Sequence, residues 1–183
     1  MPPNWIEPEI VSIPLDFVNG VTGHPLVAQT LFRRGFKDLQ AVRGFIDPSC
    51  YQSASPFDLP DMETGVALLT EAINSGHPIF VWGDFDVDGQ TATAILVDTL
   101  RKLGANVHYH LPIRARESHG IKLEALKDFI SKGVQVILTC DTGVSELASI
   151  AYAQSIGIDV VVTDHHLLPD IFIIVSNLIF APG

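Results

Sequence analysis

Short apolar runs alternate with helical segments through the second half of the sequence, and this alternation constrains the fold more than any other feature. The apolar runs cover residues 79–82, 107–110, 134–139 and 158–163. Between them, apolar residues recur every three or four positions, which predicts helices at about 91–103, 122–131 and 145–155. Strands that alternate with helices of this length form βαβ units. The sequence therefore predicts an α/β fold with a parallel sheet of Rossmann-like βαβ units flanked by helices.

The chain before residue 77 has a different pattern. Its first 20 residues contain prolines and isolated apolar residues, which predicts an extended segment. From His24 to about residue 75 apolar residues recur at helical intervals, with a Pro-rich interruption over 53–60. We therefore predict a helical N-terminal segment over residues 1–76, followed by an α/β catalytic domain over residues 77–183.

The charge and hydropathy of the chain limit its partners. A formal net charge of −10 argues against passive binding of nucleic acid over the whole surface. A metal-dependent nuclease remains possible, because bound cations reverse the local field and a few arginines can line one groove. The sequence has no apolar stretch of roughly 20 residues that would span a membrane, and its start lacks the pattern of a secretion signal. We therefore expect a cytoplasmic protein that does not associate with membranes.

Carboxylates cluster directly after the first predicted strand. Asp84, Asp86 and Asp88 alternate with other residues there, and Gly89 follows. Like charges this close repel one another unless a cation compensates them, and a turn at the glycine would let them converge on one. A calcium loop of the EF-hand type is disfavoured, because Ile95 stands where such a loop has its bidentate glutamate. A solvated acidic turn is the alternative.

Aspartate and histidine follow the third and fourth predicted strands. Asp141 comes after the third strand, where it could bind a cation or cap the next helix. His165 and His166 follow Asp164 after the fourth, so one imidazole can bind a metal while a carboxylate holds its other nitrogen. Parallel strands bring these ends to one edge of the sheet, where open α/β sheets bind ligands. Mixed carboxylate and imidazole donors favour manganese or a similar divalent ion, with magnesium possible.

Two arginines follow the second predicted strand at the same edge of the sheet. Arg114 and Arg116 are suited to contact phosphate groups, and His119 could contact a base or a phosphate. A solvated basic loop is the alternative.

Three of these segments together resemble the DHH phosphoesterase superfamily. They read GDFDVDG over 83–89, DTGVS over 141–145 and VTDHH over 162–166, in the order and spacing of that family. Within the superfamily, the chain is most similar to the RecJ type of single-strand-specific exonuclease. Upstream segments resemble the helical leader of RecJ proteins, and they lie at residues 24–26, 34–36, 45–46 and 56–62.

This resemblance implies a phosphodiesterase that releases nucleotides from the 5′ end of single-stranded DNA, in repair and recombination. It implies two ions of Mn²⁺ or Mg²⁺ in a complete family member. The direct metal ligands would be Asp86, Asp88, Asp141 and His165. Asp84 would support the first motif, His166 would face the scissile phosphate, and Arg114 would stabilise negative charge there. The substrate-binding residues would be Arg114, Arg116 and His119.

The chain also departs from the family pattern. Trp82 stands where many DHH proteins have a metal-binding histidine, and Ser118 and His119 replace a Gly-Tyr pair. Gly183 precedes the position of the fourth motif, which adds another aspartate ligand, and of the second domain, so we expect an incomplete catalytic part. Two alternatives follow from this. One is a DHH phosphodiesterase for short oligonucleotides or cyclic dinucleotides, and the other is a catalytically silent DHH-fold binding module.

Overall fold

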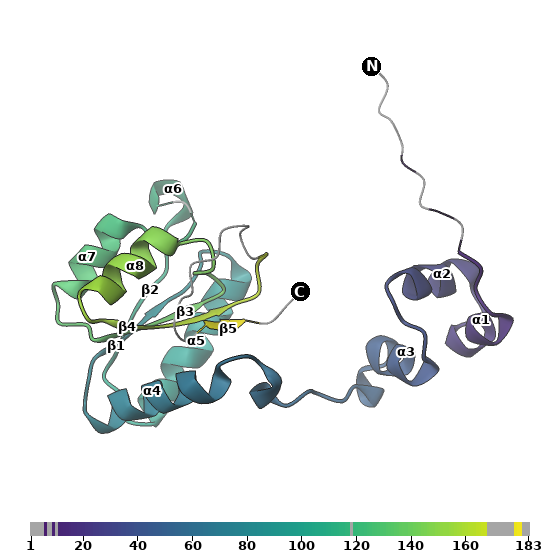
Figure 1. Ribbon diagram of the computed structural model, residues 1–183, viewed down its shortest axis with the longest axis horizontal. Helices are drawn as coiled ribbons and strands as arrows, with labels where there is room; N and C mark the ends of the chain where they lie inside the picture. The colour runs from purple at the N-terminus through teal and green to yellow at the C-terminus, as the bar shows by residue number, and fades with distance from the viewer. Residues whose placement is uncertain (1–5, 7–8, 10, 118, 168–177, 181–183) are drawn as a thin grey trace, which may run out of the picture. The chain divides into compact units, whose positions relative to one another are not determined.

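The computed structural model of this chain describes residues 6, 9, 11–117, 119–167 and 178–180 (Figure 1). Ser118, which lies between the predicted substrate-binding residues Arg116 and His119, is outside the described residues. The chain divides into two compact units, residues 1–54 and residues 55–183, which we describe separately. None of the described helices combines the length and the hydrophobicity that a membrane span requires.

The first unit is a small helical cluster. Its helices are α1 (Leu15–Val21), α2 (Pro25–Arg33) and α3 (Leu39–Ile46), followed by the short 3₁₀ helix η1 (Pro48–Cys50). Asp38 caps α3 by accepting a hydrogen bond from the Ala41 backbone N–H at 2.9 Å. A common core joins the three α-helices through the buried side chains of Phe17, Ala28, Leu31 and Val42. The prediction of an extended start is wrong for residues 15–21, because Phe17 is buried against the other helices.

The second unit contains a parallel sheet with strand order β2-β1-β3-β4-β5. The strands are β1 (Ile79–Trp82), β2 (Val107–His110), β3 (Val136–Cys140), β4 (Asp159–Asp164) and β5 (Leu178–Phe180). Every pairing is parallel, and Trp82 at the end of β1 is in register with His110 of β2 and Thr139 of β3. The sheet therefore brings the carboxyl ends of its strands to one edge. The predicted α/β fold with a parallel sheet is confirmed.

Helices cover both faces of the sheet (Figure 1). On one face α7 (Leu123–Ile130) and α8 (Leu147–Ser155) pack against a core that includes Phe80, Ile137 and Val162. On the other face α4 (Met62–Asn74) and α5 (Val87–Lys102) pack against Val81 and Leu138. The short helices η2 (Pro56–Asp58) and α6 (Arg114–Glu117) complete the unit. Because both faces are covered, β1 and β3 are buried along their whole length, which explains their uninterrupted apolar sequences.

The division of the chain into units and the start of helix α5 differ from those expected. The division of the chain follows Ala54 rather than residue 76, because the apolar face of α4, including Leu69 and Ala72, packs against the sheet. Helix α5 begins at Val87, not near Thr91, because Asp86 caps it by accepting a hydrogen bond from the Gly89 backbone N–H at 3.0 Å. Asp88 consequently lies in the first turn of a helix rather than in a loop.

Shortening Ile137 to valine tests how closely the sheet core is packed. Its side chain is only 2 % exposed at the centre of β3. Ile137→Val should lower the free energy of unfolding of the second unit by about 1 kcal/mol, because it leaves a methyl-sized cavity. The matched control is Ile156→Val, at a residue that is 47 % exposed, and it should change this energy by less than about 0.5 kcal/mol. Chemical denaturation followed by circular dichroism measures both, and equal effects would contradict the packing described.

Candidate metal centre

The predicted site residues lie at the point where the chain connections of the sheet change direction. From β1 the chain runs through α5 to β2 on one side, and from β3 it runs through α8 to β4 on the other. In open α/β sheets, such a switch point leaves a crevice between the carboxyl ends of two neighbouring strands. Here those strands are β1, which is followed by Asp84, and β3, which is followed by Asp141. His165 and His166 follow β4, the next strand in the sheet.

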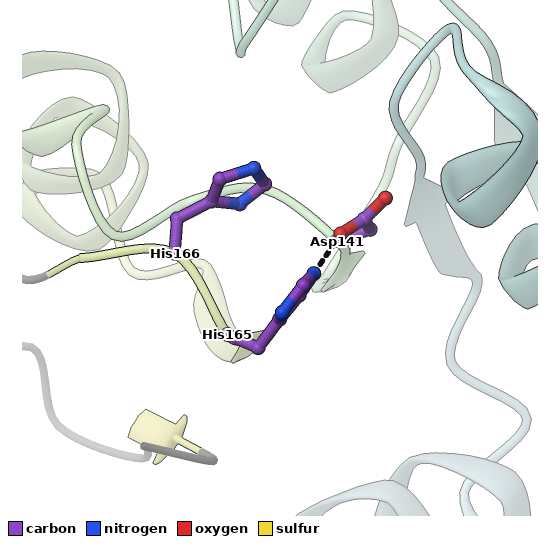
Figure 2. Close-up of side chains that lie close together, drawn as sticks. All are labelled: Asp141, His165 and His166. Atoms are coloured by element: carbon purple, nitrogen blue, oxygen red, sulfur yellow. Dashed lines mark hydrogen bonds and ion pairs between the residues drawn. The ribbon is translucent and has the colours of Figure 1, made fainter. Parts of the chain in front are cut away.

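Asp141, His165 and His166 form a compact group of donor atoms. One ligand atom from each residue can be chosen so that all three lie within 4.8 Å of one another. Figure 2 shows Asp141 and His165 directed toward each other, with His165 Nε2 2.9 Å from Asp141 Oδ1. Two imidazoles and a carboxylate this close form a donor set that suits a divalent transition-metal ion.

Asp141 has an unusual backbone and an unusual electrostatic environment. Its φ of 60° lies in the left-handed region, which non-glycine residues occupy seldom and mostly where a site requires it. Burial raises the pKa of the Asp141 carboxyl, and the charge of Asp86 raises it further, while His165 and His166 oppose the shift. Asp86 is therefore close enough to Asp141 for the two carboxylates to repel each other, and a cation between them would remove this repulsion.

Asp164 holds the histidine segment in place. Its side chain is 1 % exposed, and it accepts backbone hydrogen bonds from Val144 at 3.0 Å, His165 at 2.7 Å and His166 at 3.1 Å. Its Oδ1 also lies 2.7 Å from Nδ1 of His166. Burial opposes ionisation of Asp164, but these hydrogen bonds outweigh it and the pKa lies below its ordinary value. The hydrogen bond to Asp164 raises the pKa of His166, although partial burial opposes that shift.

The three aspartates of the first motif have different environments. Asp84 is 8 % exposed, and its Oδ1 atom is buried with no hydrogen-bond partner among the described residues. A buried carboxylate oxygen without a partner is costly unless a cation or another donor binds it. Asp86 and Asp88 are exposed, and Asp88 lines an apolar pocket of about 450 Å³ together with Asp141 and His165. The donor chemistry and the unpartnered Asp84 oxygen therefore fit a divalent cation.

A second pocket, of about 380 Å³, lies beside the group of donor atoms, and we call it the polar pocket. Its lining includes Asp84, Phe85, His119, Asp141, Glu146 and His166. Burial raises the pKa of the Glu146 carboxyl, and the charge of Asp164 adds to this effect, while the backbone of Ser145 and Gly143 and the nearby His119 oppose it. The polar pocket thus combines acidic side chains and imidazoles in a space large enough for part of a nucleotide.

The structure brings most of the sequence-predicted site residues to this edge. Asp141, His165 and His166 form the compact group, Asp84 and His119 line the polar pocket, and Asp88 lines the apolar pocket. Asp86 influences Asp141 electrostatically while capping α5. Arg114 stacks on Phe85, with its guanidinium carbon 4.8 Å from the ring centroid, and Arg116 is exposed on the same short helix.

Sequence reasoning did not assign roles to Glu146 and Phe85. It expected a carboxylate to hold one imidazole nitrogen, but it did not foresee the backbone hydrogen bonds that Asp164 accepts. A signal for Asp164 was present, because a carboxylate at the buried end of a central strand requires several donors. No spacing or composition marks Glu146, which reaches the polar pocket only through the turn that follows β3.

Comparison with known proteins identifies the family of this chain. Residues 78–181 match the DHH family, N-terminal domain, and this match covers more than half of the 183 residues. The chain belongs to the DHH family. The matched DHH segment contains all the donor residues described above, and the family resemblance inferred from the three motifs is confirmed.

The chain is also similar to RecJ proteins of several bacteria. It is 34 % identical over 155 residues to the single-stranded-DNA-specific exonuclease RecJ of Bacillus subtilis, covering 82 % of this chain and 20 % of that protein. It is 42 % identical over 113 residues to the Escherichia coli protein of the same name, covering 61 % of this chain and 20 % of that protein. The chain thus spans about a fifth of the length of these relatives.

Solved structures give the same relationship. The crystal structure of exonuclease RecJ bound to manganese matches with a TM-score of 0.64 and 34 % identity, covering 70 % of this chain and 33 % of that one. RecJ of Thermus thermophilus in complex with Mn²⁺ matches with a TM-score of 0.65 and 28 % identity, covering 91 % of this chain and 23 % of that one.

Gly89 of the DHH segment allows α5 to approach the first motif closely. A Cβ atom at this position would lie 2.5 Å from the backbone nitrogen of Asp84 and 2.6 Å from its carbonyl oxygen. Gly89→Ala should therefore displace Asp84 and destabilise the second unit by about 2 kcal/mol, although alanine is the better helix former. The control Thr99→Ala, at an exposed position of the same helix, should be neutral or slightly stabilising. Thermal denaturation followed by circular dichroism compares the two, and a Gly89→Ala variant as stable as the control would be the contrary result.

Proposed function

We propose that this chain forms the metal-binding part of a RecJ-type nuclease, which hydrolyses single-stranded DNA from its 5′ end. One observation carries the proposal, namely the group of Asp141, His165 and His166 beside the unpartnered oxygen of Asp84. The similarity to single-stranded-DNA-specific exonucleases named RecJ supports single-stranded DNA as the substrate. We also propose a cytoplasmic location, where single-stranded intermediates of DNA repair and recombination arise.

Mn²⁺ or Mg²⁺ fits carboxylate and imidazole donors. Asp86, Asp88, Asp141 and His165 would hold two such ions in a complete site, and His166 would lie beside them and face the substrate. When bound, the ions supply activation of the attacking water and neutralisation of the charge on the phosphodiester. Attack of water on phosphorus forms one P–O bond and breaks another, and the departing oxygen takes up the proton that the water releases. The scissile phosphate must accept a hydrogen bond and be held in place meanwhile, and these two tasks belong to side chains at and beside the polar pocket.

His166 and Arg114 are suited to these tasks. Because Nδ1 of His166 is hydrogen-bonded to Asp164, Nε2 is the ring nitrogen left to donate a hydrogen bond to the scissile phosphate. Arg114 lies against Phe85, whose side chain lines the polar pocket, and its guanidinium can pair with a phosphate oxygen. Arg116 and His119 would contact neighbouring parts of the strand, and Asp84 would support the first motif from beneath.

Substrate choice tests the proposal. The purified chain is incubated with Mn²⁺ and with end-labelled single strands, duplexes or dinucleotides, beside the double variant Asp86→Ala, His165→Ala. We expect Mn²⁺-dependent release of mononucleotides from single strands, starting at the 5′ end, and loss of this activity in the variant.

Two other outcomes would contradict the proposal and identify an alternative. Cleavage of dinucleotides alone would indicate a DHH phosphodiesterase for short oligonucleotides or cyclic dinucleotides. No Mn²⁺-dependent difference between the chain and its variant on any substrate would indicate a catalytically silent binding module.

A further inference from the structure

The helix that carries the two arginines is too short to be stable by itself. Helix α6 has four residues, and its backbone is closed by hydrogen bonds from Arg116 and Glu117 to the Ile113 carbonyl at 2.8 and 2.9 Å. An isolated turn of this length does not persist in water, because the cost of ordering it exceeds the gain from so few hydrogen bonds. A tertiary contact must therefore hold α6 at the end of β2.

Glu117 supplies this contact. Its Oε2 atom accepts a hydrogen bond from Nε2 of His110 at 2.5 Å, and its Oε1 atom lies 3.5 Å from the backbone N–H of Ile113. The two side chains of the Glu117–His110 pair are only 25 % and 19 % exposed. A partly buried hydrogen bond to a charged group stabilises the structure more than the same hydrogen bond does at the exposed surface.

His110 is itself fixed to the sheet. It is the last residue of β2, and its ring lies 4.8 Å from the ring of Trp82 and 5.2 Å from that of Phe129. Both of these aromatic side chains belong to the core that α7 and α8 cover. The Glu117–His110 pair therefore connects α6 to the aromatic core of the second unit.

The same arrangement determines where Arg114 lies. Its guanidinium stacks on Phe85, and the Phe85 carbonyl accepts a hydrogen bond from Gln90 Nε2 at 2.6 Å, which holds that segment against α5. Glu117 directs its carboxylate to His110 and Ile113. Among the described residues, no carboxylate forms an ion pair with Arg114. The arginine charge is thus held against Phe85, which lines the polar pocket, and it remains available to an external anion.

We propose that Glu117 is a positioning residue whose hydrogen bond to His110 holds Arg114 over Phe85, ready to bind a phosphate group of the substrate. The phosphate part of this inference rests on the proposed function. The placement of Arg114 does not, since it depends only on contacts within the chain. A negatively charged residue would thereby strengthen the binding of a polyanion, which is opposite to its direct electrostatic effect.

The first arm of the test measures the placement of Arg114 without substrate. The Arg114 side-chain protons should show a ring-current shift in the NMR spectrum. The variant Phe85→Leu gives the chemical shifts of these protons in the absence of the aromatic ring. Glu117→Ala should move these signals to the Phe85→Leu position, whereas Glu117→Gln, which can still accept from His110, should largely retain the shift. Glu124→Ala removes the same charge from an exposed pair with Lys127 and should leave the signals unchanged. Unchanged Arg114 signals in Glu117→Ala would overturn the inference.

The second arm measures binding of a fluorescent single-stranded oligonucleotide by anisotropy, without divalent metal. Arg114→Ala should raise Kd about tenfold, and Glu117→Ala should raise it several-fold, although Glu124→Ala should leave it unchanged or lower it. The double variant Arg114→Ala, Glu117→Ala should bind no more weakly than Arg114→Ala alone, because Glu117 acts through Arg114. The inference would be overturned if the losses of binding free energy in the two single variants add up in the double variant. It would also be overturned if Glu117→Ala binds the oligonucleotide as tightly as Glu124→Ala does. If the unaltered chain binds no single strands even when Mn²⁺ is added, the proposed function fails, and the NMR arm alone decides the placement of Arg114.

Discussion

Replacing Asp141 by asparagine is expected to lower the rate of Mn²⁺-dependent DNA cleavage by about 10³-fold. Asp141 lies at the centre of the donor group, where His165 Nε2 approaches its carboxylate at 2.9 Å. The substitution removes one anionic ligand, and the lost stabilisation of a divalent cation and of the phosphate charge should amount to about 4 kcal/mol. Asparagine tolerates the left-handed backbone at this position, where φ is 60°, so the fold should be retained.

The matched control is Asp98→Asn, which removes a carboxylate from an exposed pair with Lys102 on α5. Initial rates on a labelled single strand are measured for both variants at saturating Mn²⁺, with circular dichroism to verify folding. A folded Asp141→Asn variant that retains more than a tenth of the control rate would exclude Asp141 as a ligand of the reacting centre.

Replacing Asp164 by asparagine should cause the second large effect, on both stability and activity. The carboxylate accepts four hydrogen bonds, from Val144, His165 and two groups of His166. An amide of the same shape presents an NH₂ group to one side of this donor set, so at least one buried N–H loses its acceptor. We expect a loss of about 3 kcal/mol in the free energy of unfolding and a further 10- to 100-fold loss in Mn²⁺ affinity, because the histidines lose their orientation.

Asp159→Asn is the matched control, since Asp159 begins the same strand and is exposed. Urea denaturation and Mn²⁺ titration of the two variants separate the stability effect from the metal effect. Equal unfolding free energies for Asp164→Asn and Asp159→Asn would contradict the role assigned to the buried carboxylate.

The sheet could be predicted from the sequence because its central strands are buried on both faces. Continuous apolar runs such as Ile79–Trp82 mark such strands clearly, and the observed bounds of β1 and β2 coincide with those expected. The position of the site followed from topology, because the carboxyl ends of parallel strands meet at one edge. Asp84, Asp141 and His166 could therefore be placed together from sequence alone.

Other elements could not be predicted because distant contacts create them. Helix α6 depends on the Glu117–His110 pair, which joins residues seven positions apart and carries no helical periodicity. Strand β5 has three residues and is defined by its pairing with β4. The start of α5 was misplaced because Asp86 and Gly89 were interpreted only as a ligand and a turn, although together they also form the helix cap.

Calorimetric titration of Mn²⁺ into the purified chain tests the central claim most directly, because it requires neither substrate nor turnover. The unaltered chain should bind Mn²⁺, and the double variant Asp86→Ala, His165→Ala should bind it at least tenfold more weakly. Circular dichroism verifies that both proteins are folded. Equal affinity in the two folded proteins would contradict the assignment of the metal centre to this edge of the sheet.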